Sequence, residues 1–304
     1  MAPLLLAAAS LFWAGNAIVG RAVHAEIAPV SLAFWRWTGA FIVVLPLALP
    51  SLKRDWPLLL RQWRSLLMLS ATGIALFSVL FYRGLDQTTA INGVLLQSTM
   101  PLMILLISAI IYRERPNLRQ ILAILVSLAG VIVIAAHGSL ARLASLSLNP
   151  GDAWVLAAVV SYALYSSLLR SRPPVHPLSL LAASFALGAL LLLPLYLAEA
   201  LSGAVTRITP ATLAAFAYLA VMPSVAAYLC FNRGLELIGS ARGGQYIHLV
   251  PLFGVLLAIA LLGEQLHAFH LVGIALIAAG LMLAQRPIGR SLGRAIRSTS
   301  RRGR

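Results

Sequence analysis

The hydrophobic residues of this chain form long, nearly uninterrupted stretches of about 20 residues, the length that a helix needs to cross a hydrocarbon core of roughly 30 Å. Short groups of charged and turn-forming residues separate them, at 51–55, 113–117, 149–152, 172–174 and 263–265. Backbone polar groups inside a bilayer must be paired within the segment, so each stretch is expected to be an α-helix. The ten expected segments are 3–20, 29–50, 64–83, 87–111, 118–136, 151–169, 177–198, 210–232, 243–262 and 268–284. The pattern predicts an all-α integral membrane protein with ten transmembrane helices.

Composition supports this class and excludes several others. The chain is 61% hydrophobic and only 10% charged, which leaves too little polar surface for a soluble domain of 304 residues. Outer-membrane barrels show short alternating segments, which are absent here. The single cysteine, Cys230, permits no intrachain disulfide, and the histidines and acids do not group at metal-ligand spacing. No phosphate-binding loop motif is present, so we expect no cofactor and no direct use of ATP.

Positive charge is distributed unevenly over the breaks. Of the 23 Lys and Arg residues, 18 fall on one side of the expected membrane, and seven of these lie in the tail from Arg286 to Arg304. Four fall on the other side, and Arg36 lies inside a segment. Cytoplasmic loops carry such an excess of positive charge, so both termini are expected in the cytoplasm. The membrane is expected to be the inner membrane of a bacterium. The net charge of +15 is therefore interpreted as an orientation signal facing lipid, not as a nucleic-acid surface.

The two halves of the sequence are similar to each other. Residues 81–132 align without a gap on 231–282, and 12 of the 52 positions are identical. The identities include an Arg-Gly-Leu run, Pro101 with Pro251, Glu114 with Glu264, and Gly130 with Gly280. Chance similarity between leucine-rich helices would not keep these residues in one register. We therefore expect one repeat at 1–140, a second at 150–285, and a basic cytoplasmic tail at 286–304.

An odd number of spans in each repeat has a consequence for topology. Five spans reverse the side on which the next repeat begins, so the second copy enters the membrane in the opposite sense. The charges of the loops agree with this reversed orientation, because loops that are basic in the first half have less basic counterparts in the second. Inverted-topology repeats are typical of secondary transporters with a site near the midplane, although channels can also be built in this way.

With these features, the sequence resembles the EamA-type family of the drug/metabolite transporter superfamily. The resemblance is carried by 12–16 (Phe-Trp-Ala-Gly-Asn), 34–36 (Phe-Trp-Arg), the segment 81–114 and the Gly-Asp pair 151–152, and it covers about 3–285. It implies ten helices in two five-helix repeats and the export of amino acids and related metabolites. The partners that it implies are a small-molecule substrate and the lipid bilayer. Oligomeric state is left open, with a monomer plausible.

Polar and aromatic residues within the spans are the candidates for a binding site, because polar groups at membrane depth are costly. Trp13 and Asn16 lie on one face of the first span, and their repeat counterparts Tyr162 and Tyr165 lie on one face of the sixth. These faces are predicted to line a central cavity, and the alternative is that the rings fill space between helices. Five further aromatics are predicted to form the outer and inner gates of the cavity, with core packing as the alternative for each: Phe77, Phe81, Tyr82, Tyr228 and Phe231.

Proline occurs near the middle of the fourth and ninth spans. Pro101 and Pro251 each leave a carbonyl without its helical partner, which predicts a hinge or a simple kink. Polar residues that surround them are candidate substrate contacts: Gln97, Ser98, Gln245, Tyr246 and His248. His248 would be a titrating group or a neutral, hydrogen-bonded histidine.

Arg36 is the one basic residue inside a span, and no acid lies at its depth. Its side chain either reaches the headgroups beside Trp35 and Trp37, or faces the cavity and attracts a substrate carboxylate. Glu114 and Glu264 are expected to cap or pair helix ends. With no carboxylate at mid-depth, a uniporter or exchanger is expected as much as a proton-coupled carrier. The rival functions are a channel or non-transporting protein and, least favoured, a membrane-embedded enzyme.

Overall fold

The computed structural model is built from packed helices, and it describes residues 1–113, 118–139, 149–204, 206–238, 246–247 and 249–285. Within these residues, the extended backbone pairs only in an isolated antiparallel bridge between Ile27 and Thr206. The all-helical prediction is confirmed for this part of the chain.

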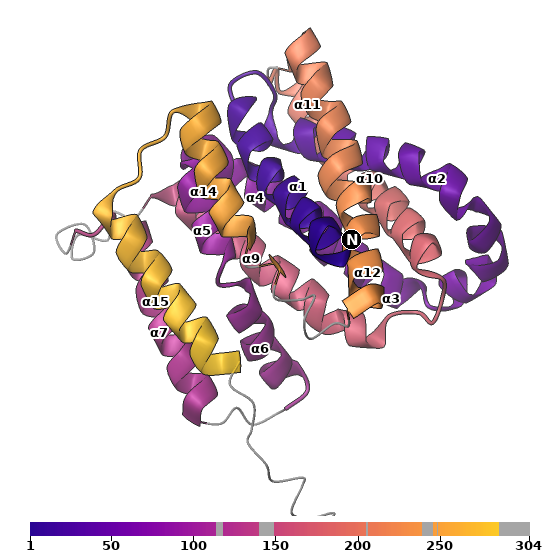
Figure 1. Cartoon of the computed structure of the whole chain (residues 1–304). Helices are drawn as coiled ribbons and strands as arrows, with labels where there is room; N and C mark the ends of the chain where they lie inside the picture. Colours follow the sequence, from indigo (N-terminus) through magenta and orange to yellow (C-terminus); the bar gives the residue numbers. More distant parts are fainter. Residues whose placement is uncertain (114–117, 140–148, 205, 239–245, 248, 286–304) are drawn as a thin grey trace, which may run out of the picture.

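Helices occur in every predicted range, and Figure 1 shows how they are arranged. Two of the short elements, η1 and η3, are π-helical turns, and η2 is a 3₁₀ turn. The elements are α1 (Ala2–Ala22), α2 (Pro29–Arg61), α3 (Trp63–Ser70), η1 (Ala71–Leu76), α4 (Phe77–Gln87), α5 (Ala90–Gln97), α6 (Met100–Ile111), α7 (Leu118–Ala135), α9 (Pro150–Leu168), η2 (Leu169–Ser171), α10 (Pro177–Leu201), α11 (Pro210–Val221), η3 (Met222–Ala226), α12 (Ala227–Ile238), α14 (Leu249–Leu262) and α15 (Ala268–Gln285).

Several of these helices have the length and composition of membrane spans. In the described part of the chain, five are long and apolar enough to cross a bilayer, and a bent pair makes up to six. The five are Ala2–Ala22, Pro29–Arg61, Trp63–Gln87, Pro177–Leu201 and Pro210–Gly234, and shorter apolar helices lie at Ile121–Ile134, Leu249–Leu262 and Ala268–Gly280. The protein is therefore a multi-pass membrane protein, and the number of ten spans stays a prediction.

The outer face of α7 shows what the lipid covers. Ile121, Leu125, Leu128 and Ile132 follow one another three or four residues apart, and all four are exposed on the isolated chain. A continuous stripe of large apolar side chains is unfavourable in water. In a bilayer the same stripe is favourable, because lipid acyl chains contact these side chains in place of protein neighbours.

The fourth predicted span is broken, not continuous. Ala90–Gln97 and Leu102–Ile111 meet at an angle of 45°. Pro101 has no N–H for the carbonyl of Gln97, which removes one helical hydrogen bond at the break. The hydroxyl groups of Ser98 and Thr99 instead donate to the carbonyls of Val94 and Leu96, at 3.2 and 2.7 Å.

The second helix is longer than predicted, and this corrects the break that the sequence suggested at 51–55. Helix α2 continues through these residues to Arg61, and it contains Pro46, Pro50 and Pro57. Proline bends a helix without always ending it, and α2 curves around the right-hand edge of the bundle in Figure 1. The charges at Lys53 and Arg54 are exposed, so this last part of α2 needs no membrane to cover it.

The two halves pack on each other through pairs of corresponding helices. Helix α2 packs on α10 and α7 packs on α15, while α4 packs on α9 as α12 packs on α1. Both π turns follow this pattern, because a π turn frees a carbonyl group. The carbonyl of Pro223 accepts a hydrogen bond from Trp13 Nε1 at 3.2 Å, and that of Thr72 accepts one from Ser161 Oγ at 2.7 Å.

The contact between α7 and α15 depends on small residues. A Cβ atom on Gly130 would lie 2.8 Å from the carbonyl oxygen of Gly273, and one on Gly280 would lie 2.6 Å from that of Ala123. The two contacts are equivalent, since 130 and 123 plus 150 give 280 and 273. Close approach of backbones through small residues is the usual way in which membrane helices associate.

We expect Gly130→Val and Gly280→Val to destabilise the protein by similar amounts, about 1–3 kcal/mol each, because each added side chain meets a backbone oxygen that cannot rotate away. Thermal unfolding of the detergent-purified protein, followed by tryptophan fluorescence, measures this. Ala129→Val, on the exposed face of α7, is the matched control and should change little. Destabilisation by only one of the two glycine variants would contradict their equivalence.

Candidate functional site

The side chain of Arg36 lies in the interior of the bundle and is only 5% exposed. It extends from α2 and donates three hydrogen bonds to groups on three other elements. Nη1 donates to Asn16 Oδ1 on α1 at 2.9 Å and to Tyr82 Oη on α4 at 3.0 Å, and Nε donates to Ser224 Oγ on η3 at 2.9 Å. The structure thus directs Arg36 inward, and the alternative in which it reaches for the headgroups is wrong.

The groups that hold Arg36 are neutral. The hydroxyl group of Tyr82 donates a hydrogen bond to Asn16 Oδ1 at 2.8 Å, and that of Ser224 donates one to the carbonyl of Leu219. The guanidinium carbon also lies 4.4 Å from the ring centroid of Trp37. Among the described residues the only ion pair joins Arg54 and Asp55, so Arg36 has no acidic partner there. Its Nη2 group donates no hydrogen bond to any described residue. A buried cation without an anionic partner is costly, and it offers a binding site for an anion.

The predicted aromatic residues form two groups of rings in contact. Trp13 packs on Tyr228 and Phe231, with ring centroids 6.1 and 5.1 Å apart. In the second group, the ring of Phe77 stacks on that of Phe81 at 5.5 Å and contacts that of Tyr162 at 5.2 Å. The predicted aromatic residues of α1, α4, α9 and α12 are therefore neighbours in space.

Arg36 and the tyrosines connect these two groups. Tyr162 and Tyr165 have ring centroids 5.2 Å apart, and the hydroxyl group of each is close enough to Tyr228 to interact with it. Tyr162 also interacts electrostatically with Arg36. We call Arg36 and these neighbours the central cluster, whose predicted members are Trp13, Asn16, Phe77, Phe81, Tyr82, Tyr162, Tyr165 and Tyr228.

Other predicted site residues are not part of this cluster. Gln97 and Ser98 donate hydrogen bonds to carbonyls of their own helix, at Gly93 and Val94. Tyr246 is tied to α1 through its backbone, whose carbonyl accepts a bond from Ser10 Oγ at 2.7 Å. Pro251 lies in the first turn of α14. Gln245 and His248 lie outside the described residues, so their predicted contacts stay predictions, as do the hinge roles of both prolines.

Sequence reasoning missed a second buried polar group, at the ends of several helices. Asp152, in the first turn of α9, is 1% exposed. Its carboxylate accepts hydrogen bonds from Thr88 Oγ1 at 2.6 Å and from Asn92 Nδ2 at 3.1 and 3.2 Å. Asn92 Oδ1 in turn lies 3.0 Å from His270 Nε2. We call Thr88, Asn92, Asp152 and His270 the carboxylate network. The polar residues of the Thr-Thr-Ala-Ile-Asn stretch at 88–92 were the available signal.

The expectation for Glu264 is confirmed. Its two carboxylate oxygens accept hydrogen bonds from the backbone N–H groups of Ala90 and Ile91, at 2.7 and 2.8 Å. These are the first residues of α5, where N–H groups lack helical partners and a negative charge is favoured. Glu114, its repeat counterpart, lies outside the described residues.

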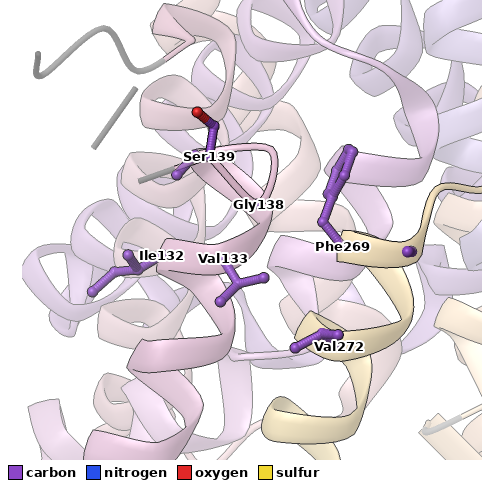
Figure 2. Close-up of a pocket in the computed structure, with 8 residues that line it drawn as sticks. Ile132, Val133, Gly138, Ser139, Phe269 and Val272 are labelled. Carbon is purple, nitrogen blue, oxygen red and sulfur yellow. The ribbon is translucent and has the colours of Figure 1, made fainter. Parts of the chain in front are cut away.

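Two cavities open near the ends of α7 and α15. The larger, of about 390 Å³, lies between the two helices and is lined mostly by apolar side chains such as Val133, Phe269 and Val272 (Figure 2). The smaller, of about 190 Å³, is lined by residues that include Asn92, Glu264 and His270. Neither is lined by a member of the central cluster. No three His, Cys, Asp or Glu residues in the described part of the chain could together hold a metal ion.

Comparison with known proteins identifies relatives over nearly the whole length. The model of the EamA-like transporter family matches residues 1–136 and again 149–285. The uncharacterized transporter YyaM of Bacillus subtilis is 26% identical over 284 residues, covering 92% of both chains. A probable terminal-alkyne amino-acid exporter of Streptantibioticus cattleyicolor is 32% identical over 228 residues, covering 74% of this chain and 72% of that protein. A solved crystal structure has the same fold, with a TM-score of 0.61, 20% identity, and coverage of 93% of this chain and 96% of its own.

Proposed function

Because the chain belongs to the EamA-like transporter family, we propose that it is a secondary transporter that exports small carboxylate-bearing metabolites, with amino acids as the expected class. Transport proceeds by alternating access to a site at the central cluster. The ten helices form two inverted repeats in the inner membrane, with both termini in the cytoplasm.

The inverted repeat is supported by three independent observations. The family model matches each half separately. The π turns η1 and η3 occur at corresponding positions, and both accept a side-chain hydrogen bond from a helix of the other half. The glycine contacts of α7 and α15 are exchanged by the same 150-residue shift. A two-fold relation in the membrane plane would produce all three.

Arg36 carries the proposal for the substrate. Its charge is buried, its described partners are neutral, and Nη2 donates no hydrogen bond to any described residue. A planar guanidinium group binds a carboxylate through two parallel hydrogen bonds, which makes arginine suited to this recognition. The rings of Trp13 and Tyr162 would contact the apolar part of the substrate. The relative named as an amino-acid exporter supports the same substrate class.

The named relatives are transporters, which implies that this protein is not an enzyme. A channel remains the second candidate, because inverted repeats also occur in channels. The two differ in kinetics: a carrier must change conformation once per substrate, so its flux saturates and is stimulated by substrate on the opposite side.

Counterflow in proteoliposomes tests the proposed function. Purified protein is reconstituted into vesicles loaded with an unlabelled amino acid, and uptake of the labelled compound is followed for a panel of standard amino acids plus one terminal-alkyne amino acid. We expect saturable, counter-stimulated uptake of a subset of the panel, and none in protein-free vesicles. Flux that rises linearly with concentration would support a channel, and no flux of any carboxylate would contradict the proposal.

A further inference from the structure

The carboxylate network has a defined pattern of hydrogen-bond donors and acceptors. The backbone N–H of His267 donates to Nδ1 of His270 at 3.0 Å, so Nδ1 carries no proton. A neutral imidazole then has its proton on Nε2, which donates to Asn92 Oδ1. This fixes the amide of Asn92 with its Nδ2 toward Asp152. Thr88 donates to the same carboxylate at 2.6 Å, so every described bond to Asp152 is one that an ionised carboxylate accepts.

This network joins the two halves of the chain at one helix end. Thr88 and Asn92 belong to the first half, while Asp152 and His270 belong to the second. Glu264, also from the second half, accepts hydrogen bonds from the N–H groups of Ala90 and Ile91, which directly precede Asn92. The first turn of α5 is therefore held by three residues of the other half. Helix α5 is the N-terminal part of the span that breaks before Pro101.

Water can approach the network from outside. The cavity of about 190 Å³ is lined by Asn92 and His270, and also by Gln265 and His267, whose side chains are exposed. It thus connects the surface of the protein to Asn92 and His270, the outer end of the network. Asp152 itself is closed off behind Asn92, so a proton that reaches it must pass the network or follow its opening.

We propose that Asp152 is the proton-binding group that couples substrate export to the proton gradient. This inference rests on the proposed transport function. One proton from the side on which the cavity opens binds the Asp152 carboxylate and gives a neutral carboxyl group. A hydroxyl oxygen is a poor acceptor, so a bond from Asn92 to the protonated oxygen is lost, the hold on the first turn of α5 weakens, and opening of this side of the bundle is favoured. When the carboxyl group loses its proton after reorientation to the opposite side, the network reforms.

Other charged and titratable groups surround Asp152 and do not replace it. From α4 these are Arg83 and Asp86, both exposed; from the end of α7, His137; from the chain before α15, Glu264 and His267; from α15, His270; and from α1, Arg21, which binds the carbonyls of Leu85 and Asp86. His270 is committed to two bonds that hold it neutral, and Glu264 is committed to the N–H groups of α5. Asp152 is the buried carboxylate at the centre of the network.

Infrared difference spectroscopy of the purified, substrate-free protein tests proton binding directly. Every acid of the chain gives a carbonyl stretch when it is protonated, so the band of Asp152 is the component that the wild type shows on acidification and Asp152→Asn lacks. Asp86→Asn, which removes a nearby exposed acid, is the matched control and should keep this component. Thr88→Val keeps Asp152 but removes one bond to its ionised form, so the band should appear about one pH unit higher. An unchanged band in Asp152→Asn, or an unchanged midpoint in Thr88→Val, would overturn the assignment.

Transport measurements separate this proposal from the function on which it rests. In vesicles assayed with the amino-acid panel, the wild type should concentrate substrate roughly tenfold per unit of imposed pH gradient if one proton is exchanged. Asp152→Asn should lose this accumulation but keep counterflow exchange. If the wild type moves no panel compound, the proposed function fails while the infrared result stands. If the wild type transports and Asp152→Asn still follows the pH gradient, only the proton assignment fails.

Discussion

Replacing Arg36 with glutamine is expected to abolish export of carboxylate-bearing substrates at ordinary concentrations. A hydrogen bond to a charged group contributes about 1.5–3 kcal/mol, which corresponds to a rise in KM of roughly 10- to 150-fold. The rise in KM should lie at the upper end of this range, because the site is nearly closed to water. In addition, all partners of Arg36 among the described residues are neutral. Glutamine keeps a donor for Asn16 and Tyr82, so the local hydrogen bonds are partly retained.

The measurement is counterflow with each panel compound that the wild type accepts, compared with its decarboxylated amine. The wild type should discriminate strongly between acid and amine, and Arg36→Gln should not. Arg36→Lys keeps the charge without the planar fork and should be intermediate. Arg64→Gln removes an exposed arginine and serves as the control for net charge. An unchanged KM for the acid in Arg36→Gln, in protein that unfolds at the wild-type temperature, would remove Arg36 from the site.

Hydrophobic patterning predicted the helices because a bilayer demands long apolar segments and permits few alternatives. It failed in two places: where a helix continues beyond the membrane into solvent, and where a helix is interrupted because one of its hydrogen bonds is missing. Helix α2 continues beyond 50 into exposed residues, since its prolines bend it without ending it. The fourth span breaks before Pro101, where hydroxyl groups of Ser98 and Thr99 satisfy carbonyls that a straight helix would leave to its own N–H groups. Such side-chain compensation is not visible in a hydropathy pattern.

The central cluster was partly accessible from sequence. Helical spacing placed Trp13 with Asn16, and Tyr162 with Tyr165, on common faces, and the structure links one member of each pair, Asn16 and Tyr162, to Arg36. The direction of the Arg36 side chain could not be predicted, because both alternatives fit its position in the span. Its partners Tyr82 and Ser224 are 46 and 188 residues away, and only tertiary structure places them beside it.

The carboxylate network shows why a single acid is hard to interpret from sequence. Asp152 has the sequence context of a helix start, beside Asn149 and Pro150, and this context suggests a surface position. Burial comes from the packing of α4 and α5 against the start of α9, and α15 contributes through the bond of His270 to Asn92. The bond between Asn92 and His270 joins residues 178 apart in the chain, which no local pattern encodes.

A cross-link that holds the first turn of α5 against the second half is expected to stop transport completely. Thr89 and Gln265 are exposed residues that line the same cavity of about 190 Å³, one beside α5 and the other beside Glu264. If this side of the bundle must open in every cycle, a short link between the two positions fixes it closed. Binding at the central cluster can persist in the linked protein, but release on that side cannot.

The most direct test uses Thr89→Cys with Gln265→Cys in a Cys230→Ser background, which removes the single native cysteine. The reconstituted protein is treated with a short bifunctional methanethiosulfonate reagent, and counterflow is measured before and after reduction. The two single-cysteine variants receive the same treatment as controls. Alternating access predicts that flux falls to the protein-free level in the linked double variant alone and returns when the link is reduced. Full flux through the linked protein would contradict it.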